Sequence, residues 1–347
     1  MATTFKNFLS NDLANTRTLL HEAIPVTGTI ASGTYSDNNI KEYGHGMFQS
    51  VYDYPFLSSS ANHIFDITYG YHSSSGIQAL TNAQNSKKMN IYNQMAQVLV
   101  GYDTTGSIKK FTTSAGTPID DAIFINFARL LSKDEIKKGS FTIDALTGGA
   151  STGTGLAGLI APISITDTSG ASGYRVDSPA GEYGYLFNTA SRGPAHMPIE
   201  VGNLYYQAGI AVLSGGAIFP EDFGAQDFTN DTKAIFPYLV TSSVINEIAD
   251  GFRNRVTNIS YNNTTELNST IYFCRVNHND FNYSSNPTYL TGSKLRVKTM
   301  AADAPVSYLT TVGMYSADNE LLAVAKLSEP LRKSSDTELT LRVRLDY

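Results

Sequence analysis

Residues 310–333 read TTVGMYSADNELLAVAKLSEPLRK, and this stretch decides the fold class. Its first half alternates, with Val312 and Met314 on the same side, as the residues of a β-strand do. The four residues SADN at 316–319 are typical of a turn. The second half is largely apolar on both faces, which predicts a strand covered on both sides, either by this chain or by a partner. Glu329-Pro330 is expected to interrupt the pairing.

The period-two pattern also assigns faces within this second strand. It places Leu321, Ala323, Ala325 and Leu327 together, opposite Leu322, Val324 and Lys326.

The final segment, DTELTLRVRLDY (336–347), alternates strictly between apolar and polar residues. This pattern predicts a strand with one buried and one exposed face. The apolar face would consist of Leu339, Leu341, Val343, Leu345 and Tyr347. We therefore expect this end of the chain to be fixed in a sheet rather than to form a free tail.

Apolar residues at three- and four-residue spacing predict helices in three places. The first is an N-terminal amphipathic helix over 4–24, which Pro25 ends and which packs on its own domain or on a neighbouring subunit. Two further helices are predicted over 86–101 and 240–256. In contrast, HIFDITYGY (63–71) alternates and predicts a strand with one aromatic and aliphatic face.

Together these elements predict an α+β fold, mainly antiparallel β, with an N-terminal amphipathic helix and two further helices. Along the chain we expect a mixed α/β body with the N-terminal helix over 1–146, a Gly/Ser/Thr-rich insertion over 147–200 and a β-rich C-terminal part over 201–347. The insertion is either a long exposed loop or a glycine-rich hairpin. Hairpin turns are predicted at 214–216 and within the Asn-rich stretch 257–276.

The composition is rich in neutral polar and aromatic residues. Of 347 residues, 41% are hydrophobic, which suffices for a core, but only 16% are charged, against roughly 25% in ordinary soluble domains. The chain has 21 Tyr and 17 Phe but no Trp. Such a surface suits strands and contacts with other proteins, because tyrosine covers a large area and loses little rotamer entropy. An ordinary β-rich protein has a similar composition, so both interpretations stay open.

Charge and hydropathy exclude two classes of partner. The net charge of −6 argues against nucleic acid, because phosphate binding needs a basic face. No window approaches 18 apolar residues, so we expect no transmembrane helix and no membrane partner, and the N-terminal residues lack the apolar core of a signal peptide. The single cysteine, Cys274, is expected to be a small buried hydrophobe beside Tyr272 and Val276.

Patterns that carry chemistry are sparse. The six histidines lack metal-ligand spacing, and only His45 in GHG and His63 near Asp66 are suggestive. Asp120 and Asp121 are adjacent, so that on a strand their carboxyl groups point to opposite faces and make a poor acid–base pair. The glycine-rich stretch GGASTGTGLAG lacks the lysine of a phosphate loop. We therefore expect no enzymatic activity, no cofactor and no metal.

Two blocks of sequence carry a resemblance to a known class of protein. The C-terminal block consists of FNYSSNPTYLTGSKLRVKTM (281–300), SYLTTVGMYSADNELLAVAKLSEPLRK (307–333) and LRVRLDY (341–347), and the other block consists of YGHGMFQSVYDYPFLSSSANHIFDITYGY (43–71) and FINFARLLSKDEIKKGSF (124–141). They resemble virion structural proteins of contractile-tailed T4-like bacteriophages, including cyanophages. The hairpin alone is also similar to a module of tail-fibre and baseplate attachment proteins. The resemblance implies a non-enzymatic, multi-copy assembly protein of the tail or baseplate.

We therefore expect a bacteriophage virion structural protein, a tail or baseplate assembly or fibre-attachment subunit, made in the host cytoplasm and located in the virion tail. Its partners would be other virion proteins and copies of itself, in a homo-oligomer. The predicted contact residues, half of which we expect to fill the core instead, are Tyr52, Tyr54, Phe56, Tyr69, Tyr71, Tyr283, Tyr289 and Tyr315. The alternative is a host-receptor or glycan-binding module at the tail tip, which exposed tyrosines and Asn-rich loops would suit.

Overall fold

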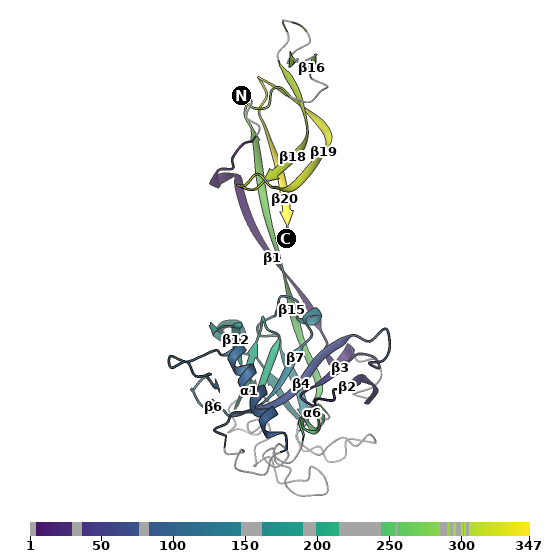
Figure 1. Ribbon diagram of the computed structural model, residues 1–347, viewed down its shortest axis with the longest axis vertical. Helices are drawn as coiled ribbons and strands as arrows, with labels where there is room; N and C mark the ends of the chain where they lie inside the picture. The colour runs from purple at the N-terminus through teal and green to yellow at the C-terminus, as the bar shows by residue number, and fades with distance from the viewer. Residues whose placement is uncertain are drawn as a thin grey trace. The chain divides into compact units, whose positions relative to one another are not determined.

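The chain divides into two compact units (Figure 1). Unit 1 comprises Met1–Leu19 and Glu266–Tyr347, and unit 2 comprises Leu20–Thr265. The computed structural model describes residues 5–29, 37–75, 83–146, 162–189, 199–214, 244–253, 256–284, 290–291, 294–295, 300, 302 and 305–347. Unit 1 therefore combines segments from both ends of the sequence, a division that differs from the linear boundaries expected at residues 146 and 200.

Unit 2 is built around an antiparallel sheet with the strand order β15-β9-β10-β12-β13-β14-β7-β4-β3-β2 (Figure 1). The strands are β2 (Ile40–Glu42), β3 (Gln49–Tyr52), β4 (His63–Tyr71), β7 (Asp121–Phe127), β9 (Thr142–Leu146), β10 (Pro162–Thr166), β12 (Gly181–Asn188), β13 (Ile199–Tyr205), β14 (Ile210–Ser214) and β15 (Val256–Val276). Shorter strands are β5 (Phe111–Thr112) with β6 (Pro118–Ile119), β8 (Glu135–Ile136) on β15, and β11 (Arg175–Ser178) on β12. The prediction of a mainly antiparallel β fold is confirmed.

Two helices pack against β4 of this sheet, α1 (Asn85–Leu99) and α6 (Ile245–Arg253). They confirm the predicted helices over 86–101 and 240–256, the second over a shorter range. Single turns of helix are α2 (Arg129–Ser132), α3 (Gly170–Gly173), η1 (Ser10–Asp12), η2 (Thr27–Thr29) and η3 (Asp37–Asn39).

The core of unit 2 is rich in aromatic side chains. Phe65, Phe127, Phe141 and Tyr261 are buried together, with ring centroids 5.2–6.2 Å apart in edge-on or stacked pairs. Aromatic pairs of this geometry contribute about 0.5–1.5 kcal/mol beyond the area that they bury. These contacts pack β4 and β7, which come early in the sequence of unit 2, against β15, which begins near the end of that sequence.

The predicted N-terminal helix is wrong, because Leu13–Ile24 forms a strand, β1, that pairs with β15. Within unit 1, Asn15 accepts a hydrogen bond from Thr270 Oγ1 (2.9 Å), and Thr16 Oγ1 donates to the Ser269 carbonyl (3.5 Å). The leucines of this segment fit a helical stripe as well as a strand. Pairing with a distant strand therefore overrides the local pattern.

Other local predictions also need correction. The Asn-rich stretch within 257–276 contains no turn, since β15 runs through it without interruption. A turn at 206–209, where Gly209 has φ +67°, joins β13 to β14, and the turn predicted at 214–216 falls largely on residues 215 and 216, which lie outside the described residues. In the predicted insertion 147–200, residues 162–189 supply strands of the main sheet.

Unit 1 contains the predicted hairpin, as β18 (Val306–Tyr315) and β19 (Leu321–Ser334). Its turn is closed by the Ser316 N–H, which donates to the Glu320 carbonyl (2.9 Å). The register shifts at Glu329-Pro330 as expected, because Leu309 pairs with Leu331 but Thr311 pairs with Lys326. The remaining strands are β16 (Leu290–Thr291) with β17 (Lys294–Leu295), and β20 (Leu339–Asp346) on β15, the last with the predicted alternation of half-buried and exposed residues.

We predict that Gly70→Ala destabilises unit 2 by about 2–3 kcal/mol, through overpacking of the interface between β4 and α1. A Cβ at Gly70 would lie 2.6 Å from the Lys88 carbonyl oxygen and 2.7 Å from the Tyr92 backbone nitrogen, and the helix backbone cannot yield as a side chain would. Urea unfolding would measure the loss. Gly44→Ala is the matched control, because a Cβ there meets no atom within 4 Å, and an equal effect of both changes would contradict the account.

Candidate interaction surfaces

Unit 1 encloses very little of its apolar surface. Among the described residues of this unit, Val276 and Met314 are the buried apolar side chains, whereas unit 2 buries the rest of the core. The large apolar side chains that unit 1 exposes are Phe5, Phe8, Leu9, Leu13, Leu19, Leu267, Tyr283, Met300, Tyr308, Tyr315, Leu321, Leu322, Val324 and Tyr347. Large contiguous apolar patches are unusual on a monomer, so these exposed side chains make unit 1 the candidate for an interaction surface.

The β18–β19 hairpin carries the best-defined part of this surface. Tyr315 pairs with Leu321 and Gly313 pairs with Val324, so these four residues share one face of the ribbon. Phe5 from the N-terminal segment packs edge-on against the Tyr315 ring, with centroids 5.2 Å apart. We call these five residues the hairpin face.

The sequence pattern assigned Leu321 to the wrong side. The register shifts between the pairs Met314–Ala323 and Tyr315–Leu321, which leaves Leu322 as an extra residue in a β-bulge. Leu321 thereby turns away from Ala323 and joins Val324. Of the two alternatives left open for the cover of β19, this chain does not cover the face with Leu321 and Val324, each of which is 52% exposed, so cover of that face by a partner stays a prediction.

A network of polar contacts holds the N-terminal segment in unit 1. Asp12 accepts a hydrogen bond from the Leu9 N–H (2.9 Å) and forms an ion pair with Arg275 of β15. The Leu9 hydrogen bond and Arg275 lower the pKa of Asp12, against the opposing effect of burial. Lys6 forms a second ion pair, with Asp280 (2.7 Å). The position of Phe5 next to the hairpin is therefore fixed by charged contacts along the same segment.

Lys333 stabilises the end of the hairpin that lies opposite the turn, where it pairs with Ser307. Its ammonium group is buried and donates to the His278 carbonyl (3.0 Å), Asn282 Oδ1 (2.6 Å) and the Ser334 carbonyl (2.7 Å). Burial lowers the pKa of Lys333. Three acceptors use all three N–H donors of the ammonium group, so we assign it a structural role.

The structure divides the predicted contact residues into three groups. Tyr54, Tyr283 and Tyr315 are exposed, and Tyr52 and Phe56 are half-buried. Tyr69 and Tyr71 are fully buried in unit 2, so they cannot contact another molecule in this conformation, and Tyr289 lies outside the described residues. Alternation along β4 predicted which face is aromatic but not that both faces of this central strand are covered.

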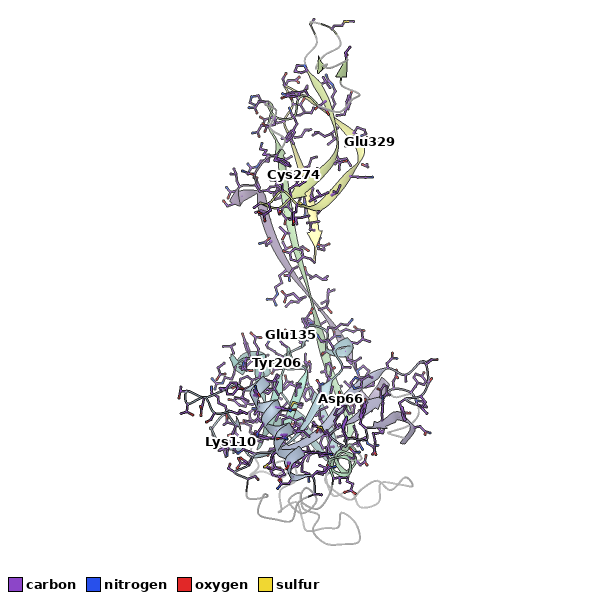
Figure 2. The ribbon with its side chains drawn as sticks, in the orientation of Figure 1. Asp66, Lys110, Glu135, Tyr206, Cys274 and Glu329 are labelled. Atoms are coloured by element: carbon purple, nitrogen blue, oxygen red, sulfur yellow. The ribbon has the colours of Figure 1, made fainter. Side chains whose placement is uncertain are left out.

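Unit 2 contains a polar cluster around Asp66, labelled in Figure 2. His63 Nε2 lies 2.8 Å from Asp66 Oδ1, which confirms their proximity, and Ser50 Oγ donates to the same oxygen (2.5 Å). In a nucleophilic triad the histidine lies between the serine and the carboxylate. Here the carboxylate lies between the other two, so this arrangement does not activate Ser50.

Next to this cluster lies a group of partly exposed rings. Tyr43 and His45 stack with an interplanar angle of 4° and centroids 5.2 Å apart, and the centroid of Phe48 is 4.7 Å from that of Tyr43. Lys41 Nζ lies 4.9 Å from the Tyr43 ring centroid. We call Tyr43, His45 and Phe48 the aromatic cluster of unit 2.

A second polar cluster was not singled out as a site from the sequence, although its charged turn at 132–139 was visible. Lys138 contacts Glu135 (3.2 Å) and Glu182 (2.6 Å), and its Nζ lies 5.4 Å from the ring centroid of Tyr206, which lies close to Glu135 in Figure 2. Burial alone would lower the pKa of Lys138, but Glu182 and Glu135 raise it. Lys138 bridges the two carboxylates and offsets one of their two negative charges, an arrangement that favours a structural role.

Asp120 and Asp121 have different surroundings, and only Asp121 lies in a strand, because β7 begins at this residue. Asp120 forms an ion pair with Lys110 (2.8 Å), whose position is labelled in Figure 2. Asp121 Oδ2 is buried and has no hydrogen-bond partner among the described residues. Burial, and then the charge of Asp120, raise the pKa of Asp121 to about 6.

The described residues contain no group of three or more His, Cys, Asp or Glu side chains that could hold a metal ion. Cys274, labelled in Figure 2, is half-buried rather than buried, and burial followed by the charge of Asp12 raises the pKa of its thiol. Within the same part of the chain, every helix is too short or too polar to span a bilayer.

Comparisons of this chain with protein-family models, curated proteins and solved structures find no match.

We predict that Asp121→Asn stabilises the protein at pH 7.5 by on the order of 2 kcal/mol and that this gain disappears near pH 4. The folded-state pKa of Asp121, about 6, lies above the unfolded value of 3.8, so the ionised carboxylate is disfavoured by folding. Below pH 3.8 the group is protonated in both states, and the destabilisation develops between pH 3.8 and 6. Thermal unfolding at a series of pH values would measure it.

Asp103→Asn is a comparison variant, for which we expect the opposite effect on stability at pH 7.5. Hydrogen bonds from Thr105 and Ser107 lower the pKa of Asp103, so its ionised form stabilises the fold above pH 3.8, and loss of the charge is expected to lower the melting temperature at pH 7.5. A pH-independent effect of Asp121→Asn would contradict the proposed burial of its charge.

Proposed function

We propose that this chain is a non-enzymatic structural subunit of a bacteriophage virion, in the tail or baseplate or at a fibre attachment, and that it acts through contacts with copies of itself and with other virion proteins. The observation that carries the proposal is the exposed apolar surface of unit 1. The resemblance of residues 281–300, 307–333 and 341–347 to phage structural proteins supports it, because these segments contribute strands and connections to the same unit.

The physical argument starts from the free energy of burial. Apolar surface removed from water contributes about 25 cal/mol per Å², so unit 1, whose described residues include two buried apolar side chains among others that are half-buried or exposed, gains less from its own folding than unit 2 does. A two-stranded ribbon is marginally stable on its own. Contact with a partner would supply the missing burial, which is the property expected of an assembly subunit.

The aromatic cluster of unit 2 favours a second candidate function, a host-receptor or glycan-binding module. The faces of aromatic rings form apolar platforms, and Tyr43 and His45 are partly exposed beside the lysine at position 41. Binding of the purified chain to host cells or a glycan array, lost on Tyr43→Ala and retained on Tyr283→Ala, would favour this candidate over the first.

The proposed function predicts that the protein is found in purified phage particles at many copies per particle. Quantitative mass spectrometry of particles from the phage that encodes the chain would measure this, with the capsid protein as internal standard. Absence from intact particles, or turnover of a small substrate by the purified chain, would contradict the proposal.

We further predict that deletion of residues 336–347 abolishes soluble expression or incorporation into particles. The segment contains β20, which pairs with β15 from Ser269–Asp346 to Val276–Leu339. Its loss would expose the backbone edge of β15 and remove the apolar side chains that alternate along β20. Solubility and incorporation would be compared with those of Leu57→Ser, a change at an exposed position of unit 2, and normal behaviour of the truncated chain would contradict the prediction.

A further inference from the structure

We propose that the hairpin face binds the same face of a second copy of this chain, in an antiparallel two-fold contact. This inference rests on the proposed function, since it names one partner for the surface that carries that proposal.

The hairpin face is largely uncovered. Phe5, Tyr315, Leu321 and Val324 are each about half exposed, at 47–52%. The position that a Cβ of Gly313 would occupy lies 3.1 Å from the Tyr315 ring and 3.4 Å from Leu321 Cδ1, so these side chains extend over the glycine. A sheet face of this kind is ordinarily covered by a second sheet about 10 Å away.

Charged residues flank the hairpin face on opposite sides. The turn at one end carries Asp318 and Glu320, both exposed. At the other end, Lys326 pairs with Thr311 and so lies on the same face as Val324. Among the described residues, none of these three charged groups has an ion-pair partner within 4 Å. The hairpin therefore carries acidic residues in its turn, at one end of the apolar face, and a basic residue at the other end of that face.

When two copies of this face meet, opposite charges lie next to each other only if the two hairpins run antiparallel. Because the bulge at Leu322 shortens the ribbon on the turn side, the two-fold axis would cross the hairpin face between Leu321 and Val324, and it would bring the turn of each copy, with Asp318 and Glu320, towards Lys326 of the partner subunit. A parallel arrangement would bring acid against acid and base against base, which is destabilising. A contact of this type uses one patch on both copies and closes at two chains, the commonest symmetry of soluble oligomers.

The experiment is a charge exchange in the full chain, with the dissociation constant measured by sedimentation velocity over a range of concentrations. The unaltered chain is expected to have the mass of two chains at high concentration. Lys326→Glu and Glu320→Lys should each weaken the dimer about tenfold, because each change turns two attractive pairs into repulsive ones. The double variant, Lys326→Glu with Glu320→Lys, should recover most of the lost affinity.

Val176→Lys is the matched control, because Val176 is an exposed apolar residue of unit 2, and this change should leave the dissociation constant unaltered. Circular dichroism of each variant would show that its strands are retained. A single-chain mass at all concentrations, no response to the single changes, or a double variant as weak as either single one would overturn the inference. If such a chain still enters particles, the contact fails while the proposed function stands.

Discussion

Most apolar side chains among the described residues of unit 1 are exposed or only half-buried, and this incomplete burial is the constraint on which the rest of the account depends. Unit 2 buries rows of aromatic and aliphatic residues between its sheet and the helices α1 and α6. Unit 1 has comparable strands, but among its described residues Val276 and Met314 are the buried apolar side chains. Since burial of apolar area is the dominant favourable term in folding, our proposal is that the stability of unit 1 depends on a partner more than that of unit 2 does.

The same constraint explains the polar contacts of unit 1. Where an enclosed core is missing, ion pairs and directed hydrogen bonds fix the arrangement of the strands, as Asp12 with Arg275 and Lys333 with its three acceptors do. Such contacts contribute modest free energy but define geometry well. They keep Phe5 beside Tyr315, within the face that we propose to bind a partner. Preorganisation of this kind lowers the entropy lost on association.

Local sequence pattern predicted those elements whose faces have distinct surroundings. Period-two alternation predicted β4, β18, β19 and β20, and the apolar stripe of 86–101 predicted α1. The pattern failed at Leu13–Ile24, where a helix and a strand fit the same leucines and pairing with the distant β15 decides. It also failed at Leu321, because a single bulge residue reverses a face without any local signal. For the candidate surface, Tyr315 was predicted, but Phe5, Leu321 and Val324 were not. Their exposure depends on which distant segments pack over them, and a local sequence pattern does not contain this information.

Hydrogen–deuterium exchange at two protein concentrations tests the central claim most directly. Backbone amides of an uncovered ribbon exchange through local opening, and coverage by a partner raises their protection. The account predicts that amides of Val306–Tyr315 and Leu321–Ser334 exchange more slowly at high concentration, while those of β4 and β7 in unit 2 are unchanged. Equal and strong protection of the hairpin in a dilute, monomeric sample would show that unit 1 is stable without a partner and would contradict the account.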